Sequence, residues 1–412
     1  MKILAYALHI STQHNKGYIG GAWVRFVEFL KRAEKFDIKY VLVEPAPKFG
    51  DNYESILVNA NGYEEIGDTA FAIFNATIKG IRRVLKGDID LILSPIDAPH
   101  NILPSFITSI LTGAPFTVIV HNVPVFHGII EENPEKKFSL TLRGFYKAIR
   151  YYKHKKKSMY YIIFSTLFNY MVSKILKTTT IIGIGSGATY LNLLDKKLSV
   201  REVFPGNSIP LSEIIKEQKS PEKKIYDAVY VGNLKEEKGV LDSIIVWNIV
   251  TKKNHSLKLK IIGRVNNKMM LQQINSLINN LDLENNVFLC DDPILGASTS
   301  ELIKSMKESK ILLFPSKLEA WSFTVGEALS LGLPVIGYDL QAYKRAYPSC
   351  KALIKVPLGD LQKLATEVTR LLENPNNILT LSKEAVQYMT NYYTWNQVIS
   401  AERKLYKEII FS

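Results

Sequence analysis

Cysteine is scarce in this sequence, since only Cys290 and Cys350 occur among its 412 residues. Neither cysteine has the spacing of a zinc site, and two cysteines cannot build the framework of a disulfide-rich secreted domain. The amino terminus lacks the small-residue cleavage site of a signal peptide, and its alternating apolar residues predict a buried first strand. We therefore expect a protein of the reducing cytoplasm.

Charge is missing from residues 98–130, which contain no Lys, Arg, Asp or Glu. A transmembrane helix would need ~20 consecutive, predominantly apolar residues. This stretch is instead interrupted by helix-breaking residues, namely Pro99, Pro104, Gly113, Pro115 and Pro124. It predicts a buried helix followed by a buried strand.

Acidic residues are missing from residues 143–177, where lysine and arginine are mixed with tyrosine and phenylalanine. The whole chain has a formal net charge of +13, which favours anionic partners. The segment suits an anionic membrane surface, with basic groups on the headgroups and aromatic rings at the interface. A solvated helix followed by a buried one would have the same composition, and so would a nucleic-acid surface on which bases stack. We favour the membrane over nucleic acid, and expect peripheral association with its cytoplasmic face.

Apolar, β-rich runs alternate with amphipathic segments along nearly the whole chain, which is typical of parallel sheets covered by helices. The first half contains the runs KILAYA, KYVLVE, DLILS, FTVIV and TTIIGI, and the second contains AVYVGN, LKLKIIG, NVFLC, ILLFPS and PVIGYD. Residues 206–224 between the halves are polar and suit an interdomain linker. The predicted fold class is α/β, with two Rossmann-like domains whose strand-end loops face a central cleft.

The stretch FPSKLEAWSFTVGE, residues 314–327, places two carboxylates after an apolar strand. Glu319 falls in the expected strand-end loop, and Glu327 falls in the first turn of a helix expected to open at Thr324. An ionised carboxylate accepts two hydrogen bonds at once, which suits a sugar hydroxyl or the diol of a ribose. The amides at the helix start, from Phe323 to Val325, suit phosphate.

Both acids also fit a purely structural interpretation. Thr324 with Glu327 has the spacing of a helix capping box, and Ser316 with Glu319 has the same spacing.

The stretch FPSKLEAWSFTVGE resembles the donor-binding signature of retaining GT-B glycosyltransferases of the family-four type, in which two glutamates follow a strand ending in Phe-Pro-Ser. The tail EALSLGLPVIGYD is similar to the helix, turn and next strand of that family. Residues 229–242, VYVGNLKEEKGVLD, resemble its glycine turn and the basic residue before the first helix of the nucleotide-binding domain. Where the family usually has an arginine after the glycine, this chain has Asn233, and Lys235 is a candidate replacement.

The resemblance implies a site for a nucleotide-diphosphate sugar. Its catalytic residues would be Glu319 on the sugar, Lys238 on the diphosphate and His121 on the sugar or acceptor, while Glu327 would bind the ribose. The other substrate-binding residues would be Gly232, Asn233, Gly263, Ser322, Phe323, Thr324, Val325, Gly20 and Gly21. Three plainer interpretations remain open: a solvated Lys238, a structural His121, and glycines 20 and 21 chosen for a tight turn.

The resemblance also implies the domain organisation. Residues 1–205 would form an acceptor-binding domain and residues 206–393 the nucleotide-sugar-binding domain. Residues 394–412 would form a terminal helix that packs back on the first domain.

Two further patterns carry less weight. GIGSGA, from residue 183, lacks the spacing and the acidic residue of a dinucleotide site, and we expect Ser186 to cap a helix there. Asp88 and Asp90 form a D-x-D pattern, but they precede a strand rather than follow it. We therefore predict neither a metal nor a cofactor.

The predicted function is a metal-independent, retaining transfer of a hexose-type sugar to a glycan or lipid-linked acceptor. The family implies same-face attack in which the leaving phosphate takes the proton of the acceptor. Fixed dipoles and cations would then stabilise the charge of the diphosphate. A nucleic-acid-binding or nucleic-acid-modifying protein on a GT-B scaffold and a nucleotide-sugar epimerase stay open as alternatives.

Overall fold

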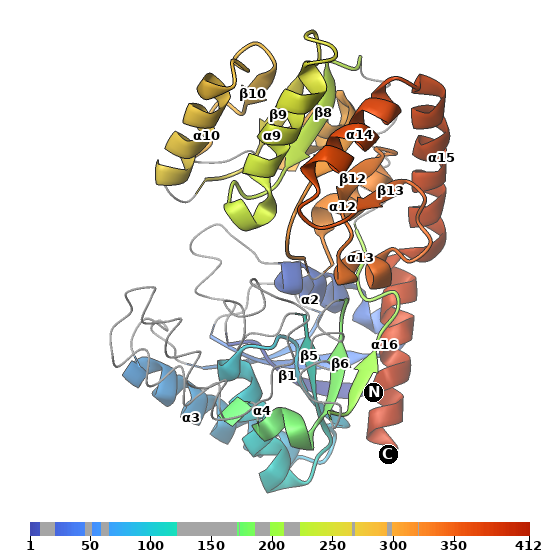
Figure 1. Cartoon of the computed structure of the whole chain (residues 1–412). Helices are drawn as coiled ribbons and strands as arrows, with labels where there is room; N and C mark the ends of the chain where they lie inside the picture. The colour runs from blue at the N-terminus through green and yellow to red at the C-terminus, as the bar shows by residue number, and fades with distance from the viewer. Residues whose placement is uncertain are drawn as a thin grey trace. The chain divides into compact units, whose positions relative to one another are not determined.

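The computed structural model describes residues 1–8, 21–45, 52–58, 66–121, 171–172, 174–185, 198–209, 223–265, 268–294, 299–319 and 321–412. For residues 21, 22, 24, 66–70 and 99 it describes only the backbone. Contacts between residues divide the chain into two units, Met1–Asn207 with Trp395–Ser412, and Ser208–Thr394. Figure 1 shows the elements of both.

The first unit is built on a seven-stranded parallel sheet with the order β3-β2-β1-β4-β5-β6-β7. Its strands are β1 (Lys2–Tyr6), β2 (Lys39–Glu44), β3 (Glu54–Leu57), β4 (Leu91–Ser94), β5 (Phe116–Val120), β6 (Thr180–Gly183) and β7 (Val200–Glu202). Its helices are α2 (Gly21–Arg32), the short 3₁₀ helix η1 (Ala33–Phe36), α3 (Ile66–Val84), α4 (Pro99–Thr112) and α16 (Trp395–Ile410).

The direction of each crossover determines which face of the first sheet a helix covers. The chain steps one way across the sheet from β1 to β2 and the opposite way from β3 to β4 and from β4 to β5. Since parallel crossovers are right-handed, α3 and α4 lie on one face and α2 lies on the other. α16 packs with α2, and the ring centroids of Phe29 and Trp395 are 6.3 Å apart.

The second unit has a six-stranded parallel sheet with the order β10-β9-β8-β11-β12-β13. Its strands are β8 (Tyr226–Val231), β9 (Leu259–Ile262), β10 (Val287–Leu289), β11 (Ser309–Phe314), β12 (Val335–Tyr338) and β13 (Leu353–Val356). Its helices are η3 (Glu236–Lys238), α9 (Val240–Thr251), α10 (Lys268–Asn280), α11 (Thr299–Lys307), α12 (Phe323–Ser330), α13 (Gln341–Ala346), α14 (Leu361–Leu372) and α15 (Pro375–Tyr392).

Each unit has its own hydrophobic core. The strands of the second sheet are buried along nearly continuous apolar runs, as expected of parallel strands covered on both faces. In the first unit the core includes Trp395 and Tyr406 of α16, which is why the end of the chain belongs to this unit. The predicted α/β class with two Rossmann-like units is confirmed.

No helix in the described parts of the chain combines the length and the apolar character that crossing a bilayer requires.

Candidate functional site

The glycine turns after β8 and β9 meet at the carboxyl edge of the second sheet. Gly263 follows β9 with φ +154°, and a Cβ atom added there would lie 1.7 Å from the carbonyl oxygen of Gly232, which follows β8. Gly239 has φ +77°, and a Cβ atom added there would lie 1.9 Å from the carbonyl oxygen of Pro315 after β11. The predicted Gly232 and Gly263 therefore lie in contact, and the backbone of Gly232 leaves no room for a side chain at position 263.

Replacing Gly263 by alanine is expected to lower the free energy of unfolding by about 2–3 kcal/mol, because the new methyl group must displace the Gly232 backbone. The matched control is Gly359→Ala, where φ is +82° but no atom lies within 4 Å of the added carbon. The control should cost only about 1 kcal/mol of backbone strain. Urea unfolding of both variants measures the difference, and equal losses would show that the close approach is unimportant.

Lys238 and Glu319 come together at the same edge. Lys238 ends η3 after β8, and its Nζ donates to Glu319 Oε1 at 2.7 Å and to the Leu318 carbonyl at 3.2 Å. The Glu319 side chain is only 8% exposed and that of Lys238 is 27% exposed. A cation and a carboxylate that are far apart in sequence are thus hydrogen-bonded to each other. They lie in the loops that follow the adjacent strands β8 and β11.

The hydroxyl of Tyr230 fixes the turn that carries Lys238. It lies 3.1 Å from each of the Asn233 and Lys238 carbonyl oxygens and can donate to either. Burial raises the pKa of Tyr230, so the hydroxyl keeps its proton at neutral pH. Nothing in the sequence around this tyrosine indicates the role, which depends on how the turn folds back over the strand.

The cap of α12 differs from the predicted one. The helix begins at Phe323, and its N-cap is Ser322, whose hydroxyl accepts a hydrogen bond from the Val325 amide at 3.4 Å. The predicted start at Thr324 is therefore wrong by one residue, and Thr324 with Glu327 is not a capping box. The Val325 N–H already donates to the Ser322 hydroxyl. The amides of Phe323 and Thr324 are therefore the ones in the first turn that could donate to an anion.

Ser322 itself adopts a strained backbone, with φ +68° and ψ +96°. Its carbonyl accepts a hydrogen bond from the buried Tyr347 hydroxyl at 3.1 Å. Strain of this kind persists only where the surroundings enforce it, and it concentrates at functional sites.

Glu327 is the fifth residue of α12 and lies beyond the first turn that the sequence predicts for it. Burial raises its pKa to about 7. A carboxyl group in this environment changes its charge near neutral pH, unlike an ordinary glutamate.

A second polar cluster, which the sequence did not reveal, holds the loop that carries Glu319. Asp242, in the first turn of α9, accepts a hydrogen bond from the Tyr338 hydroxyl at 2.7 Å and lies 3.1 Å from Lys317 Nζ. The Lys317 amide also donates to the Glu237 carbonyl at 2.9 Å. Lys317 thus anchors the loop after β11 to α9 through its side chain and to η3 through its amide.

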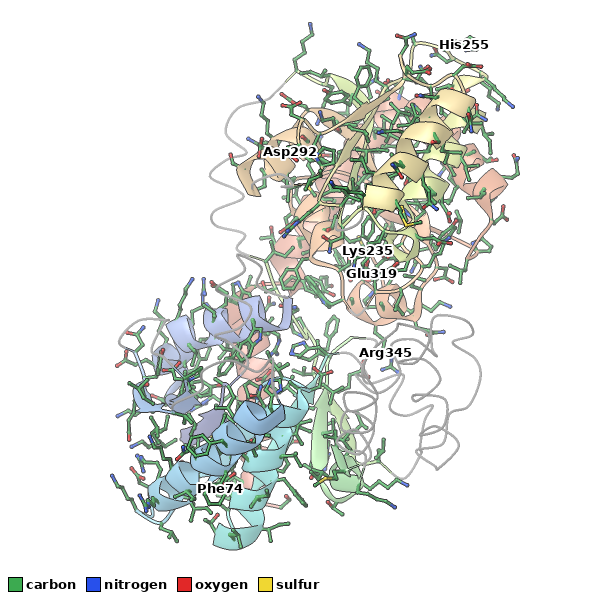
Figure 2. All side chains as sticks on the ribbon, turned by 90° about the vertical axis from the view of Figure 1, so that its left-hand side faces the viewer. Phe74, Lys235, His255, Asp292, Glu319 and Arg345 are labelled. Carbon is green, nitrogen blue, oxygen red and sulfur yellow. The ribbon has the colours of Figure 1, made fainter. Side chains whose placement is uncertain are left out.

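Asn233 and Lys235 lie in the turn between β8 and η3. Lys235 Nζ is 3.8 Å from Glu237 Oε1, and the lysine side chain is 43% exposed. Figure 2 shows Lys235 and Glu319 at the same end of the second unit. That Lys235 replaces the missing arginine stays a prediction.

Of the residues predicted in the first unit, the structure describes Gly21 and His121. Gly20 is outside the described residues, and Gly21 is the first residue of α2. His121 follows β5 directly and is 7% exposed. Burial, helped by the nearby charge of Arg25, lowers the pKa of His121 to about 3, so the imidazole is neutral. Ser186 also lies outside the described residues.

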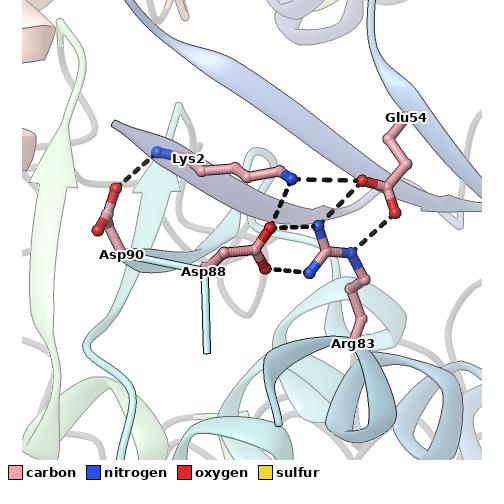
Figure 3. A network of polar contacts seen from close by, with 5 residues as sticks. All are labelled: Lys2, Glu54, Arg83, Asp88 and Asp90. Carbon is pink, nitrogen blue, oxygen red and sulfur yellow. Dashed lines mark hydrogen bonds and ion pairs between the residues drawn. The ribbon is translucent and has the colours of Figure 1, made fainter. Parts of the chain in front are cut away.

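Asp88 and Asp90 precede β4 and are engaged by cations and a backbone amide (Figure 3). The hydrogen bonds of Arg83 hold the pKa of Asp88 well below its usual range, and Lys2 Nζ lies 2.7 Å from the same carboxylate. Asp90 accepts a hydrogen bond from the Lys2 amide at 2.7 Å. Within the described residues, no three His, Cys, Asp or Glu side chains gather as metal ligands would.

Comparison with known proteins finds a family model that matches part of the second unit. The model of the family described as glycosyl transferases group 1 matches residues 212–390. The matched residues lie within the second unit and include Lys238, Glu319 and Glu327.

Sequence relatives match part of the chain, and solved structures are similar in fold over the whole chain. An uncharacterized glycosyltransferase of Methanocaldococcus jannaschii, MJ1059, is 39% identical over 117 residues, which is 28% of this chain and 27% of that protein. The matches to curated relatives cover less than half of those proteins' own length. The crystal structure of a glycosyltransferase from Rickettsia africae is similar with a TM-score of 0.65 at 14% identity, covering 99% of this chain and 98% of that one.

The structure of Anabaena HepE in complex with UDP and glucose is similar over 100% of both chains, with a TM-score of 0.63 and 14% identity. At this level of identity the likeness shows the fold alone. The group 1 domain is therefore the second of two Rossmann-like units with the GT-B fold, as the resemblance predicted.

Proposed function

We propose that the chain is a glycosyltransferase that moves a hexose-type sugar from a nucleotide-diphosphate sugar to a glycan or lipid-linked acceptor, with retention of configuration and without a metal. The observation that carries the proposal is the contact between Lys238 and Glu319, 2.7 Å apart beside the paired glycine turns of the group 1 domain.

The described groups supply what departure of a diphosphate requires. Lys238 provides a fixed positive charge, and the first amides of α12 provide backbone dipoles, which together would stabilise negative charge on the leaving group. Glu319, held by Lys238, would accept hydrogen bonds from sugar hydroxyls and orient the anomeric carbon. In the proposed same-face reaction the leaving phosphate takes the proton of the acceptor hydroxyl, so no protein nucleophile is needed.

UDP is the first donor nucleotide to test, because Anabaena HepE has been crystallised with UDP and with UDP-glucose. Release of nucleoside diphosphate from UDP-, GDP- and ADP-sugars is measured with and without glycan and lipid-linked acceptors. The proposal predicts release with one donor class and retention of configuration in the product. An isomerised sugar nucleotide would indicate an epimerase, and nucleic-acid binding without turnover of any donor would contradict the proposal.

Donor affinity should depend on pH through Glu327. The proposed ribose contact requires the ionised carboxylate, and burial raises the pKa of Glu327 to about 7. The dissociation constant of the nucleotide sugar, whose phosphates do not titrate in this range, is therefore expected to rise up to about tenfold for each unit that pH falls below 7. Calorimetric titrations between pH 5 and 8 measure this, and Glu327→Gln should bind weakly with little pH dependence. A wild-type affinity that does not change with pH would contradict the ribose contact.

The raised pKa of Glu327 also makes the stability of the folded protein depend on pH, but in the opposite direction to donor affinity. Between about pH 4.5 and 7 the folded protein keeps a proton on Glu327 that the unfolded chain has released. Its contribution to the free energy of unfolding therefore falls as pH rises through this window, and Glu327→Gln should remove that dependence.

A further inference from the structure

The outer side of α3 and α4 in the first unit carries large apolar side chains that the core does not use. We call these residues the α3–α4 surface: Phe71 (59% exposed), Phe74 (63%), Leu85 (70%), Ile107 (37%), Ile110 (63%) and Leu111 (63%). Leu85 directly follows the last residue of α3. α3 and α4 pack against each other, so their outer side chains form one surface, and Figure 2 shows Phe74 on α3.

The packing of α3 explains why these side chains remain outside. The helix faces the sheet with small residues, since Ala72 and Ala76 are fully buried and a Cβ on Gly80 would lie 1.7 Å from the hydroxyl of Tyr6. That hydroxyl is hydrogen-bonded to Thr108 of α4 at 2.5 Å, which fixes both helices closely over the strand. The small residues therefore face inward and the phenylalanines outward, the reverse of an ordinary amphipathic helix.

The exposed charges at the carboxyl end of α3 are basic, whereas Asp68 lies near the start of the helix and Asp88 beyond its end is paired with Arg83. Residues 71–86 include Lys79, Arg82, Arg83 and Lys86 but no Asp or Glu, and α4 has no charged residue. Arg82 and Lys86 are exposed at the carboxyl end of α3. The crossover from β5 to β6 runs in the same direction as that of α4, so its described helical residues 174–178 lie on the same face and add exposed Lys174 and Lys177.

We infer that the α3–α4 surface docks onto an anionic lipid membrane. Exposed aromatic and aliphatic side chains bordered by cations match the interface of such a membrane, where rings enter the headgroup region and cations meet lipid phosphates. A second copy of the chain would bring the same exposed cations, Arg82 and Lys86, to this face, which disfavours it as the partner. The inference concerns binding alone, so it stands or falls independently of sugar transfer.

Sedimentation with lipid vesicles, without any sugar donor, tests this inference. The intact chain is expected to sediment with vesicles containing phosphatidylglycerol and not with phosphatidylcholine alone, and salt should weaken the binding. Phe71→Ser combined with Phe74→Ser and Ile110→Ser should weaken it at least tenfold. Arg82→Gln with Lys86→Gln should reduce the preference for anionic vesicles.

The matched control is Met269→Ser with Leu379→Ser, which removes comparably exposed apolar side chains (66% and 61%) from the second unit. This control should bind vesicles like the wild type. Thermal unfolding checks that the triple variant is folded, and its transition should match that of the wild type. If it does not, the vesicle experiment is done with Phe74→Ser alone.

Three results would overturn the inference. One is no binding of the wild type to anionic vesicles, and another is undiminished binding by the variants of α3 and α4. The third is a wild-type dimer in sedimentation equilibrium that these variants convert to monomer, which would assign the surface to a second copy.

Discussion

Replacing Lys238 by alanine is expected to lower the turnover number by about 10²–10³-fold, the usual cost of removing one preorganised group that stabilises charge in the transition state. The lysine is held in place before any substrate enters, because its Nζ contacts both Glu319 and the Leu318 carbonyl. Its positive charge would act on the diphosphate as the sugar leaves. Steady-state kinetics with a saturating donor measures the loss in the turnover number.

Lys235→Ala is the matched control for this experiment. Lys235 lies three positions earlier, is more exposed at 43%, and has its closest acidic contact at 3.8 Å. Its removal should leave the turnover number nearly unchanged unless Lys235 replaces the arginine of the family, in which case donor affinity falls. Wild-type turnover in Lys238→Ala would contradict the proposed role of the lysine.

Replacing Arg25 by methionine is expected to lower the free energy of unfolding by about 3–5 kcal/mol, because it leaves a buried carboxylate without its cationic partner. The Arg25 side chain is 2% exposed and that of Glu402 is 1% exposed, and the two form an ion pair between α2 and α16. Arg25 Nε also donates to the Gly206 carbonyl at 2.7 Å, and its guanidinium lies 4.5 Å from the centre of the Phe29 ring. One side chain therefore joins α2, α16 and the end of the first segment of this unit.

Two further variants distinguish the loss of the buried ion pair from the loss of a positive charge in general. Arg25→Met combined with Glu402→Gln should recover part of the loss, because no unpaired charge then remains buried. Lys31→Met, on the same helix, removes a lysine that is 55% exposed and paired with Glu28 at 2.8 Å. This exposed pair should contribute less than about 1 kcal/mol. Chemical unfolding of the four proteins checks the order, and a Lys31→Met loss equal to that of Arg25→Met would contradict it.

The fold could be predicted because the spacing of apolar residues along the chain alternates between the pattern of strands and the pattern of helices. Parallel strands place their carboxyl ends on one edge, so Gly232, Gly263 and Glu319 could be expected together once each was recognised as the end of a strand. The contact of Lys238 with Glu319 follows from the same rule, since β8 and β11 are neighbours in the sheet.

The parts that could not be predicted depend on backbone detail or on distant partners. Ser322 and Thr324 are both favourable capping residues in sequence, and the observed start of α12 depends on the backbone at Ser322, where φ is +68°. Tyr338 and Asp242 are 96 positions apart, and neither residue has a local pattern that indicates the other. The pKa of Glu327 depends on how deeply α12 is buried, which the spacing of the two glutamates does not encode.

The most direct measurement of the central claim is the unfolding of the protein with and without nucleoside diphosphates. A diphosphate at 100 times its dissociation constant should add about 2.7 kcal/mol to the free energy of unfolding. That gain should be largely lost when Lys238→Ala and Glu327→Gln are combined, since both residues are proposed to contact the ligand. If no nucleoside diphosphate stabilises the wild type, or if the double variant is stabilised equally, the carboxyl edge of the second sheet is not the donor site.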